Sequence, residues 1–364
     1  MHLAEVRVET VEIPFREPFV SGKERWEQLR AGILVLTTDD GRRALGEFPA
    51  PRPDDLGEDV SPRLVSTLSG LELADPVAVE GSLREIDAWP FVGRAARSAV
   101  ESALMDLLAQ VNRRPLSTFL HAEATDTVGL NVTLGIDEPA ITAAAAAAAV
   151  EAGFRTLKLK AADEPAGVLT ARVAAVRQAV GSQVTLRLDF NGSLSTETAS
   201  DVLAAVAGYD IEYAEQPLAP SAGAEALAHL RWTGAVPVAA DEAVRDVGSA
   251  RVLLETGAAD ALVVKPARVG GLRQAEAIIE LATTESVPII VSTLFESGVG
   301  LAGALHLAAT APGSQAHGLA TAGLLESDLL VESPVIRDGQ VAVPSGPGLG
   351  VELDEEAVAR YRAA

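Results

Sequence analysis

Lysine is scarce in this chain, and its positions point to chemistry. Among 364 residues the only lysines are Lys23, Lys158, Lys160 and Lys265, and three of these four lie in short apolar segments. A lysine can lose its proton in a suitable environment, whereas an arginine in a protein stays protonated. The use of lysine at positions 158, 160 and 265, in a chain that otherwise relies on arginine, therefore indicates acid/base chemistry or carboxylate binding.

Three carboxylates continue this pattern. Asp189, Glu215 and Asp241 lie at or near the ends of the apolar runs VTLRLDF, IEYAEQP and VPVAADE. Counting from Lys160 through these carboxylates to Lys265, the successive separations are 29, 26, 26 and 24 residues. Each separation is the length of one strand–helix unit, so we expect all five side chains at the same end of a parallel sheet, where such enzymes hold their active sites.

Carboxylates placed side by side need compensating positive charge, because like charges raise one another's pKa. An all-oxygen set selects Mg²⁺ or Mn²⁺, and we expect Asp189, Glu215 and Asp241 to bind one of these ions. Any one of them alone could be a helix cap or an ion-pair partner. We expect Lys160 to act as the general base, with Lys265 facing it across the metal and Lys158 neutralising a substrate carboxylate.

Short apolar runs and Ala-rich helical segments alternate from residue 126 to residue 334, which predicts an α/β fold, a (β/α)7–8 TIM-like barrel. The expected strands are 128–135, 156–160, 184–190, 211–217, 236–242, 261–266, 287–293 and a weak eighth at 315–319. A doubly wound open sheet is the structural alternative, but no Gly-rich phosphate loop follows the first strand.

Residues 1–125 read as an α+β capping domain with active-site loops, joined by the C-terminal segment 335–364. Met1–Ile13 and Gly32–Thr38 alternate as strands, and Arg94–Gln110 has the spacing of an amphipathic helix. Arg16–Leu29 is polar and predicts a mobile loop in which Lys23 closes over the substrate. The segment APRPDDLGE, starting at residue 50, predicts a second loop.

The composition limits the classes of partner. The formal net charge of −22 makes nucleic acid and anionic membrane poor partners. There is no cysteine, which rules out thiolate catalysis and cysteine zinc sites, and the sequence shows neither a signal peptide nor an apolar run that could span a membrane. We therefore expect a cytoplasmic enzyme with a small-molecule carboxylate substrate; association into a homo-oligomer is left open.

The segments LKLKA, RLDFNGS, YAEQPL, AADEAV and VVKPARVGG together resemble the muconate-cycloisomerase subgroup of the enolase superfamily. The resemblance implies that Lys160 and Lys265 are the catalytic lysines and that Asp189, Glu215 and Asp241 are the metal ligands. It also implies abstraction of a proton α to a carboxylate, giving an enediolate stabilised by Mg²⁺.

Within that superfamily the segments 292–308, 317–330 and 333–356 resemble o-succinylbenzoate synthases. This resemblance implies dehydration of a succinyl-hydroxycyclohexadiene carboxylate to o-succinylbenzoate, a step of menaquinone biosynthesis. Lys265 would then stabilise the substrate by cation–π contact instead of moving a proton. The implied substrate contacts are Arg187, Asn191, Ser292, Thr293, Glu296, Ser297, Gly318 and Lys23.

Alternatives remain on the same scaffold: an N-succinylamino acid racemase, a dipeptide epimerase or a muconate-type cycloisomerase. Dipeptide epimerases usually carry an Asp-x-Asp motif after the eighth strand, and Ser327-Asp328-Leu329 does not reproduce it. Phe295 and Ala320 depart from the o-succinylbenzoate synthase pattern. From other classes, a Schiff-base aldolase using Lys265 and a non-catalytic barrel are the alternatives.

Overall fold

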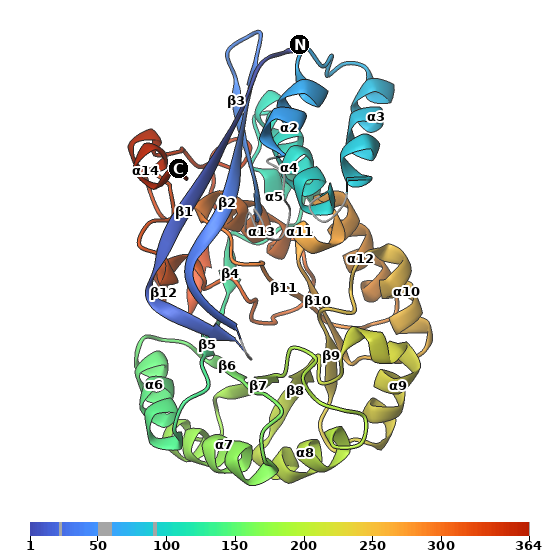
Figure 1. The fold of residues 1–364 in the computed structure, drawn as a ribbon, viewed down its shortest axis with the longest axis vertical. Helices are drawn as coiled ribbons and strands as arrows, with labels where there is room; N and C mark the ends of the chain where they lie inside the picture. The colour runs from blue at the N-terminus through green and yellow to red at the C-terminus, as the bar shows by residue number, and fades with distance from the viewer. Residues whose placement is uncertain (22–23, 50–59, 90–92, 364) are drawn as a thin grey trace.

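The computed structural model describes residues 1–363 except 22–23, 50–59 and 90–92. Its N-terminal part is built on an antiparallel sheet of three strands, β1 (Leu3–Ser21), β2 (Glu24–Thr38) and β3 (Arg43–Pro49). β1 and β2 form a long hairpin that runs from the N-terminal layer down toward the parallel sheet (Figure 1). A turn at residues 39–41 joins β2 to β3, and its Gly41 amide donates to the Thr38 carbonyl.

The prediction of a loop over Arg16–Leu29 is wrong, because this segment forms the end of the β1–β2 hairpin. Backbone pairing continues to Ser21 and Glu24, with a register shift between Pro14 and Phe19. Pro14 and Pro18 interrupt the local alternation at this register shift, and the irregularity accommodates them while the ladder goes on. Lys23 and the predicted loop that begins at residue 50 lie outside the described residues.

Helices cover the N-terminal sheet: α2 (Ser61–Leu68), α3 (Pro76–Asp87), α4 (Gly93–Val111) and α5 (Leu116–Leu120). The structure confirms the helix predicted over Arg94–Gln110 as α4. Ala99, Ala103 and Leu107 on this helix are buried against the sheet. Leu108 is 41% exposed, so it lies beside the buried face instead of within it.

The second part of the chain is a parallel sheet of seven strands that curls around its own core, with helices on the outside (Figure 1). Its strands are β5 (Asn131–Leu134), β6 (Thr156–Lys160), β7 (Thr185–Asp189), β8 (Ile211–Glu215), β9 (Val238–Ala240), β10 (Ala261–Val264) and β11 (Ile289–Val291). The helices are α6 (Pro139–Glu151), α7 (Ala166–Val180), α8 (Ala199–Val206), α9 (Gly223–Thr233), α10 (Val247–Glu255), α11 (Pro266–Val269), α12 (Leu272–Thr284) and α13 (Gly298–Ala308).

The order of the strands decides against a doubly wound sheet. The strands follow one another from β5 to β11 without a reversal, whereas a doubly wound sheet reverses at its ligand crevice. The eighth strand expected at 315–319 is reduced to two isolated parallel bridges, His317 with Leu130 and Gly318 with Ser292. These bridges connect the segment to both edges of the curled sheet.

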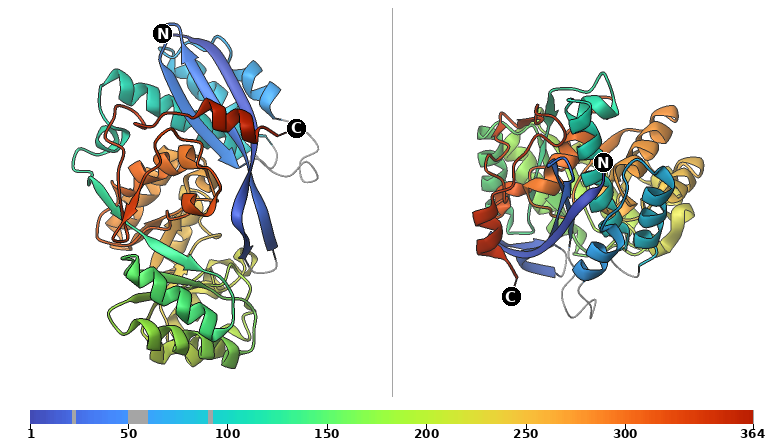
Figure 2. Two further views of the ribbon diagram at one scale, coloured as in Figure 1. Left: turned by 90° about the vertical axis from the view of Figure 1, so that its left-hand side faces the viewer. Right: turned by 90° about the horizontal axis from the view of Figure 1, so that it is seen from above.

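The C-terminal segment packs back on earlier parts of the chain. The strand β12 (Ile336–Arg337) pairs with β13 (Gln340–Ala342), which in turn pairs with β4 (Thr127–Gly129), and α14 (Glu355–Tyr361) lies beside β1 (Figure 2). Arg7 on β1 donates two hydrogen bonds to Glu355, at 2.9 and 2.7 Å. Within the described ranges, none of the helices is both long and apolar enough to cross a bilayer.

Candidate active site

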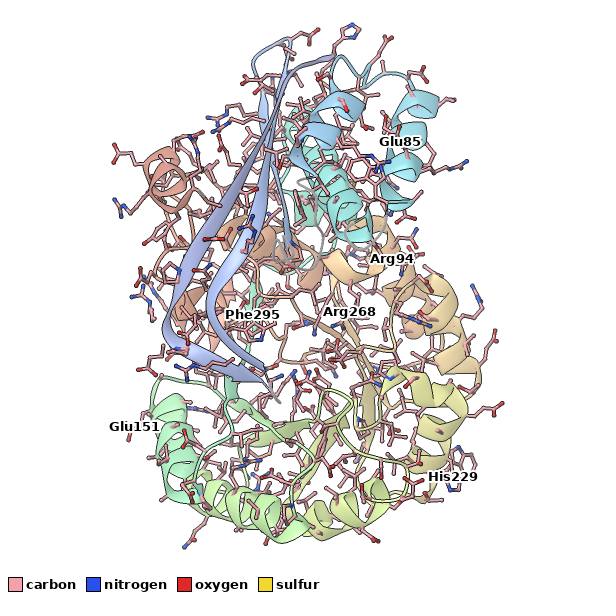
Figure 3. The ribbon with its side chains drawn as sticks, in the orientation of Figure 1. Glu85, Arg94, Glu151, His229, Arg268 and Phe295 are labelled. Carbon is pink, nitrogen blue, oxygen red and sulfur yellow. The ribbon has the colours of Figure 1, made fainter. Side chains whose placement is uncertain are left out.

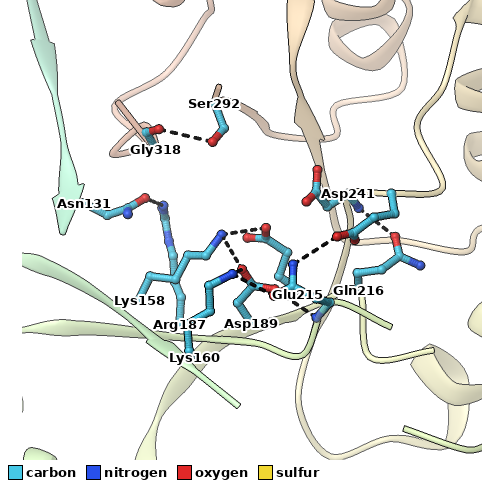
Figure 4. A network of polar contacts seen from close by, with 12 residues as sticks. Asn131, Lys158, Lys160, Arg187, Asp189, Glu215, Gln216, Asp241, Ser292 and Gly318 are labelled. Atoms are coloured by element: carbon cyan, nitrogen blue, oxygen red, sulfur yellow. Dashed lines mark hydrogen bonds and ion pairs between the residues drawn. The ribbon is translucent and has the colours of Figure 1, made fainter. Parts of the chain in front are cut away.

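Five charged side chains project from the carboxyl ends of neighbouring strands, as their spacing predicts. The strand register places Lys160 opposite Asp189 and Asp189 opposite Glu215, while Asp241 and Lys265 directly follow β9 and β10. All five are buried, with at most 9% of their surface exposed. Parallel strands end at the same edge of a sheet, so the charged groups share one mouth (Figure 4).

Lysines are paired with each of the three carboxylates. The ammonium of Lys158 lies 2.8 Å from Asp189 and 2.6 Å from Glu215, and Lys160 donates to the same Asp189 oxygen at 2.8 Å. On the other side of the group, Lys265 donates to Asp241 at 2.7 Å. The three lysines that the sequence predicts to be catalytic therefore lie within hydrogen-bond distance of the predicted metal ligands.

The pKa values show how strongly these charges interact. Burial would raise the pKa of Asp189, but the ammonium groups of Lys158 and Lys160 hold it well below its usual value. Burial, opposed by Lys158 but assisted by the negative charges of Asp189 and Asp241, raises the pKa of Glu215 to about 7. The three carboxylates and the lysines beside them thus form one electrostatic unit, in which burial and the mutual repulsion of the carboxylates oppose the attraction of the ammonium groups.

Asn191 and Gln216 hold this cluster in place. Asn191 accepts from Lys160 at 2.7 Å and donates to Glu242 at 3.0 Å. The Gln216 side chain, 1% exposed, accepts from the Asp241 amide at 2.9 Å and from the Ala243 amide at 3.0 Å. Asn191 was predicted to contact the substrate, but its side chain is occupied by the catalytic lysine and an acidic neighbour.

Arg268 is a member of the site that the sequence reasoning missed. It lies on the single turn α11, three residues after Lys265, and donates to the second carboxylate oxygen of Asp241. Figure 3 shows Arg268 in the middle of the molecule, between the N-terminal layer and the parallel sheet. The signal was present in the motif VVKPARVGG, because residues three apart on a helical turn lie on one face.

The donor set fits a hard divalent cation in its chemistry. Asp189, Glu215 and Asp241 offer only oxygen, all three are at most 1% exposed, and their mutual repulsion would be relieved by a cation. In the arrangement observed, however, no three acidic or imidazole side chains among the described residues converge closely enough to hold an ion. Lysine ammonium groups lie between the carboxylates, so metal binding requires these lysine contacts to move.

A pocket of about 80 Å³ that is partly open to solvent lies beside the cluster. Its charged lining residues are Lys158, Lys160, Asp189 and Lys265. The rest of the lining is formed by Asn131, Val132, Thr133, Ser292, Thr293, Phe295, Gly318, Ala320, Thr321 and Leu324. Of the residues predicted to contact the substrate, Ser292, Thr293 and Gly318 therefore line this pocket.

Arg187 lies one layer below the pocket and is 1% exposed. Its guanidinium donates to Asn131 at 3.0 Å, to the Ala316 carbonyl at 2.6 Å and to Glu212 at 2.5 Å. It also lies 4.8 Å from the centre of the Tyr213 ring. Side chains two residues apart on a strand lie on the same face, so Arg187 lies in the layer beneath Asp189. Its N–H groups donate to Asn131, Glu212 and the Ala316 carbonyl.

Glu296 and Ser297 face away from the pocket toward the N-terminal part of the chain. Ser297 donates through its hydroxyl to Glu47 at 2.6 Å. Burial, with the charge of Glu47 adding to it, raises the pKa of Glu296 to about 8, so this carboxyl group is neutral at pH 7. Both residues were predicted to contact the substrate; in the structure Ser297 is hydrogen-bonded to the buried Glu47 of strand β3, and the Glu296 side chain is hydrogen-bonded to Thr293.

The histidine that lies nearest to the site has a packing role. The Nδ1 atom of His317 accepts from the Val291 amide at 2.9 Å. Burial, together with the nearby charge of Arg187, lowers the pKa of His317 to about 4, so its ring is neutral. This hydrogen bond connects the segment around His317, where an eighth strand was expected, to strand β11.

Comparisons with known proteins agree with this geometry. Residues 141–357 match the family described as enolase C-terminal domain-like. The chain is 29% identical to the hydrophobic dipeptide epimerase of Enterococcus faecalis, over 96% of this chain and 99% of that protein. It is 36% identical to the o-succinylbenzoate synthase of Thermobifida fusca over 57% of this chain and 64% of that protein.

The fold also matches a solved structure, that of a substrate-liganded complex of the L-Ala-D/L-Glu epimerase from Bacillus subtilis. The TM-score is 0.88 at 28% identity, and the match covers 96% of this chain and 99% of the other. The strand-end lysines and carboxylates, the curled parallel sheet and the matched family together show that the chain is a member of the enolase superfamily.

Proposed function

We propose that this enzyme abstracts the proton α to a carboxylate, with Lys160 and Lys265 as the acid/base groups. The observation that supports this is that both lysines line one pocket although they come from different strand ends, Lys160 from β6 and Lys265 from the residue after β10, which three other strands separate. A substrate bound between them would present one face of its α-carbon to each amine. General acid/base catalysis by a positioned amine contributes about 10²- to 10⁴-fold in rate.

The chain's own residues divide the work between them. Lys160, held by Asp189 and Asn191, takes the proton; Lys158, between Asp189 and Glu215, binds the substrate carboxylate and balances the charge that develops on it. Mg²⁺ bound by Asp189, Glu215 and Asp241 would supply further positive charge to the same carboxylate. The superfamily's solved relatives from Enterococcus faecalis and Cytophaga hutchinsonii are complexed with Mg, which supports that choice of ion.

For the substrate we propose the succinyl-hydroxycyclohexadiene carboxylate, dehydrated to o-succinylbenzoate. Among the described residues that line the pocket, the only acid is Asp189, which two lysines already bind. The wall of Ser292, Thr293 and Thr321 offers hydroxyl groups, which suit an acyl side arm better than the free ammonium group of a dipeptide. In this reaction Lys160 would return its proton to the departing hydroxyl, and loss of water would make the ring aromatic.

Racemisation of N-succinylamino acids is the second candidate. It is favoured by Lys265, which lines the same pocket as Lys160 and in a racemase would deliver a proton to the other face of the same carbon. The acyl side arm is common to both substrates, so the pocket wall suits both. A Schiff-base aldolase needs no metal, whereas Asp189, Glu215 and Asp241 together offer the all-oxygen set that a divalent cation prefers.

The first experiment is an absorbance assay of the succinyl-hydroxycyclohexadiene carboxylate with Mg²⁺, comparing the wild type with Lys160→Ala. We expect rapid conversion by the wild type and a loss of at least about 100-fold in the variant. If the wild type does not convert it, N-succinylamino acids and dipeptides are incubated in D₂O and the α-proton is followed by NMR. Exchange that continues unchanged in both Lys160→Ala and Lys265→Ala would refute the proposed acid/base pair.

A further inference from the structure

A buried carboxylate joins the N-terminal part of the chain to the loop that forms one wall of the pocket. Glu47 on strand β3 is 5% exposed and accepts three hydrogen bonds from the start of helix α13. The donors are the Ser297 amide at 2.7 Å, the Ser297 hydroxyl at 2.6 Å and the Gly300 amide at 2.8 Å. The first amides of a helix have no partner within the helix, and Glu47 supplies one from a distant part of the chain.

Both sides of this contact are built for close approach. A Cβ atom on Gly46 would lie 2.1 Å from the Ala99 carbonyl oxygen of α4, so β3 lies directly against that helix. A Cβ atom on Gly300 would lie 2.6 Å from the Cβ of Glu296 and 3.2 Å from Glu47. Neither backbone can move far, which sets the position of the Glu47 carboxylate relative to α13.

The segment just before α13 carries pocket residues. Ser292, Thr293 and Phe295 line the pocket, and Phe295 has a φ angle of 63°, which is unfavourable for a residue with a side chain. The ring of Phe295 also packs edge-to-face against Phe15 of strand β1, with 5.7 Å between ring centres. A loop in such a conformation persists only where contacts with its surroundings stabilise it. The hydrogen bonds from Ser297 and Gly300 to Glu47 stabilise the C-terminal end of this loop.

We propose that Glu47 is a positioning residue that fixes the pocket loop 292–296 through Ser297 and Gly300. Glu47 does not line the pocket and does not contact Lys160 or Lys265. It therefore affects substrate binding only by setting the positions of Ser292, Thr293 and Phe295, which line the pocket. The effect on loop placement is independent of the reaction, whereas the expected effect on kinetics rests on the proposed function.

Asp106 provides a matched control. It is also a buried carboxylate of the N-terminal part, 3% exposed, and accepts hydrogen bonds from the Leu45 amide at 3.1 Å and the Leu349 amide at 2.9 Å. Its partners belong to β3 and the C-terminal segment, not to the pocket loop. Asp106→Asn should therefore loosen the packing between parts of the chain without moving the pocket loop.

The first test is hydrogen–deuterium exchange of the full-length chain, comparing the wild type, Glu47→Gln and Asp106→Asn. An amide nitrogen in place of one carboxylate oxygen cannot accept a hydrogen bond, so at least one donor of Ser297 or Gly300 loses its partner. We expect exchange over 292–300 to become at least about tenfold faster in Glu47→Gln and to stay within about twofold in Asp106→Asn. Equal exchange in this segment for both variants would overturn the proposal, whether or not any substrate is turned over.

The second test is kinetic, on the substrate that the wild type converts. We expect KM to rise about tenfold in Glu47→Gln while kcat changes less than about threefold, because the binding wall moves and the lysines do not. Faster exchange with an unchanged KM would refute the positioning role. If Glu47→Gln does not fold, Ser297→Ala removes the hydroxyl bond alone, and a smaller change in the same two measurements is expected; no change in either would overturn the proposal.

Discussion

The neutral carboxyl group of Glu296 gives a prediction whose sign follows from its surroundings. Burial beside Glu47 raises its pKa from an ordinary value of 4.5 to about 8. Between these two values the folded protein holds a proton that the unfolded chain releases. Stability contributed by this group is therefore present at low pH and is lost as the pH rises toward 8.

The size of the effect follows from the same two values. The pKa of Glu296 differs by roughly 3.5 pH units between the folded and unfolded forms. At about 1.4 kcal/mol per unit, ionisation of this group can lower the free energy of unfolding by at most about 5 kcal/mol. Relaxation and water entry around the charged form reduce this, and we expect about 2–3 kcal/mol. Glu296→Gln cannot ionise, so its stability relative to the wild type should improve by that amount between pH 5 and pH 9.

The assay is urea unfolding of the wild type and Glu296→Gln at several pH values, with the difference in the free energy of unfolding taken at each. Glu332→Gln, at an exposed position, serves as the control, and its difference from the wild type should stay within about 0.5 kcal/mol throughout. A difference for Glu296→Gln that does not change with pH, or one that falls as the pH rises, would refute the reasoning.

Three further predictions address other parts of the site. Burial lowers the pKa of His306 to about 4, so the wild type should lose stability relative to His306→Gln as the pH falls from about 6.5 toward 4. Urea unfolding at pH 7 and pH 4.5 measures this; a difference in the free energy of unfolding that is the same at both pH values would contradict it. Arg187→Met should cost about 2–3 kcal/mol, since it leaves the buried side-chain oxygen of Asn131 and the Ala316 carbonyl without their donor; a loss under about 1 kcal/mol in the same assay would argue against a supporting role. EDTA should abolish activity and Mg²⁺ restore it in the wild type, whereas Asp241→Asn should remain inactive with Mg²⁺; full recovery of that variant would remove Asp241 from the metal ligands.

Features that depend on local pattern could be predicted from the sequence. The separations between Lys160, Asp189, Glu215, Asp241 and Lys265 are each one strand–helix unit, and in a parallel sheet that period is enough to bring the side chains to one edge. Helix α4 was predicted for the same reason, since its apolar residues recur at helical spacing.

Features that depend on distant partners could not be predicted. The hairpin over residues 16–29 forms because each strand supplies the other's hydrogen bonds, although prolines interrupt its local pattern. The contact between Glu47 and Ser297 joins residues 250 positions apart, and no spacing rule connects them. The same holds for Arg187. Its position two residues before Asp189 on one strand could be predicted, but the hydrogen bonds that it donates to Asn131 and to the Ala316 carbonyl could not.

The sequence by itself therefore determined the family, the parallel sheet and the set of charged residues at its mouth, because these follow from the period of strands and helices along the chain. Only the tertiary structure shows how the charged side chains pair and which hydroxyl groups line the pocket. It alone also shows that the buried carboxylate of Glu47 is hydrogen-bonded to the end of the pocket loop 292–296. Those outcomes depend on the packing of side chains from segments far apart in the sequence, and such packing has no local signature.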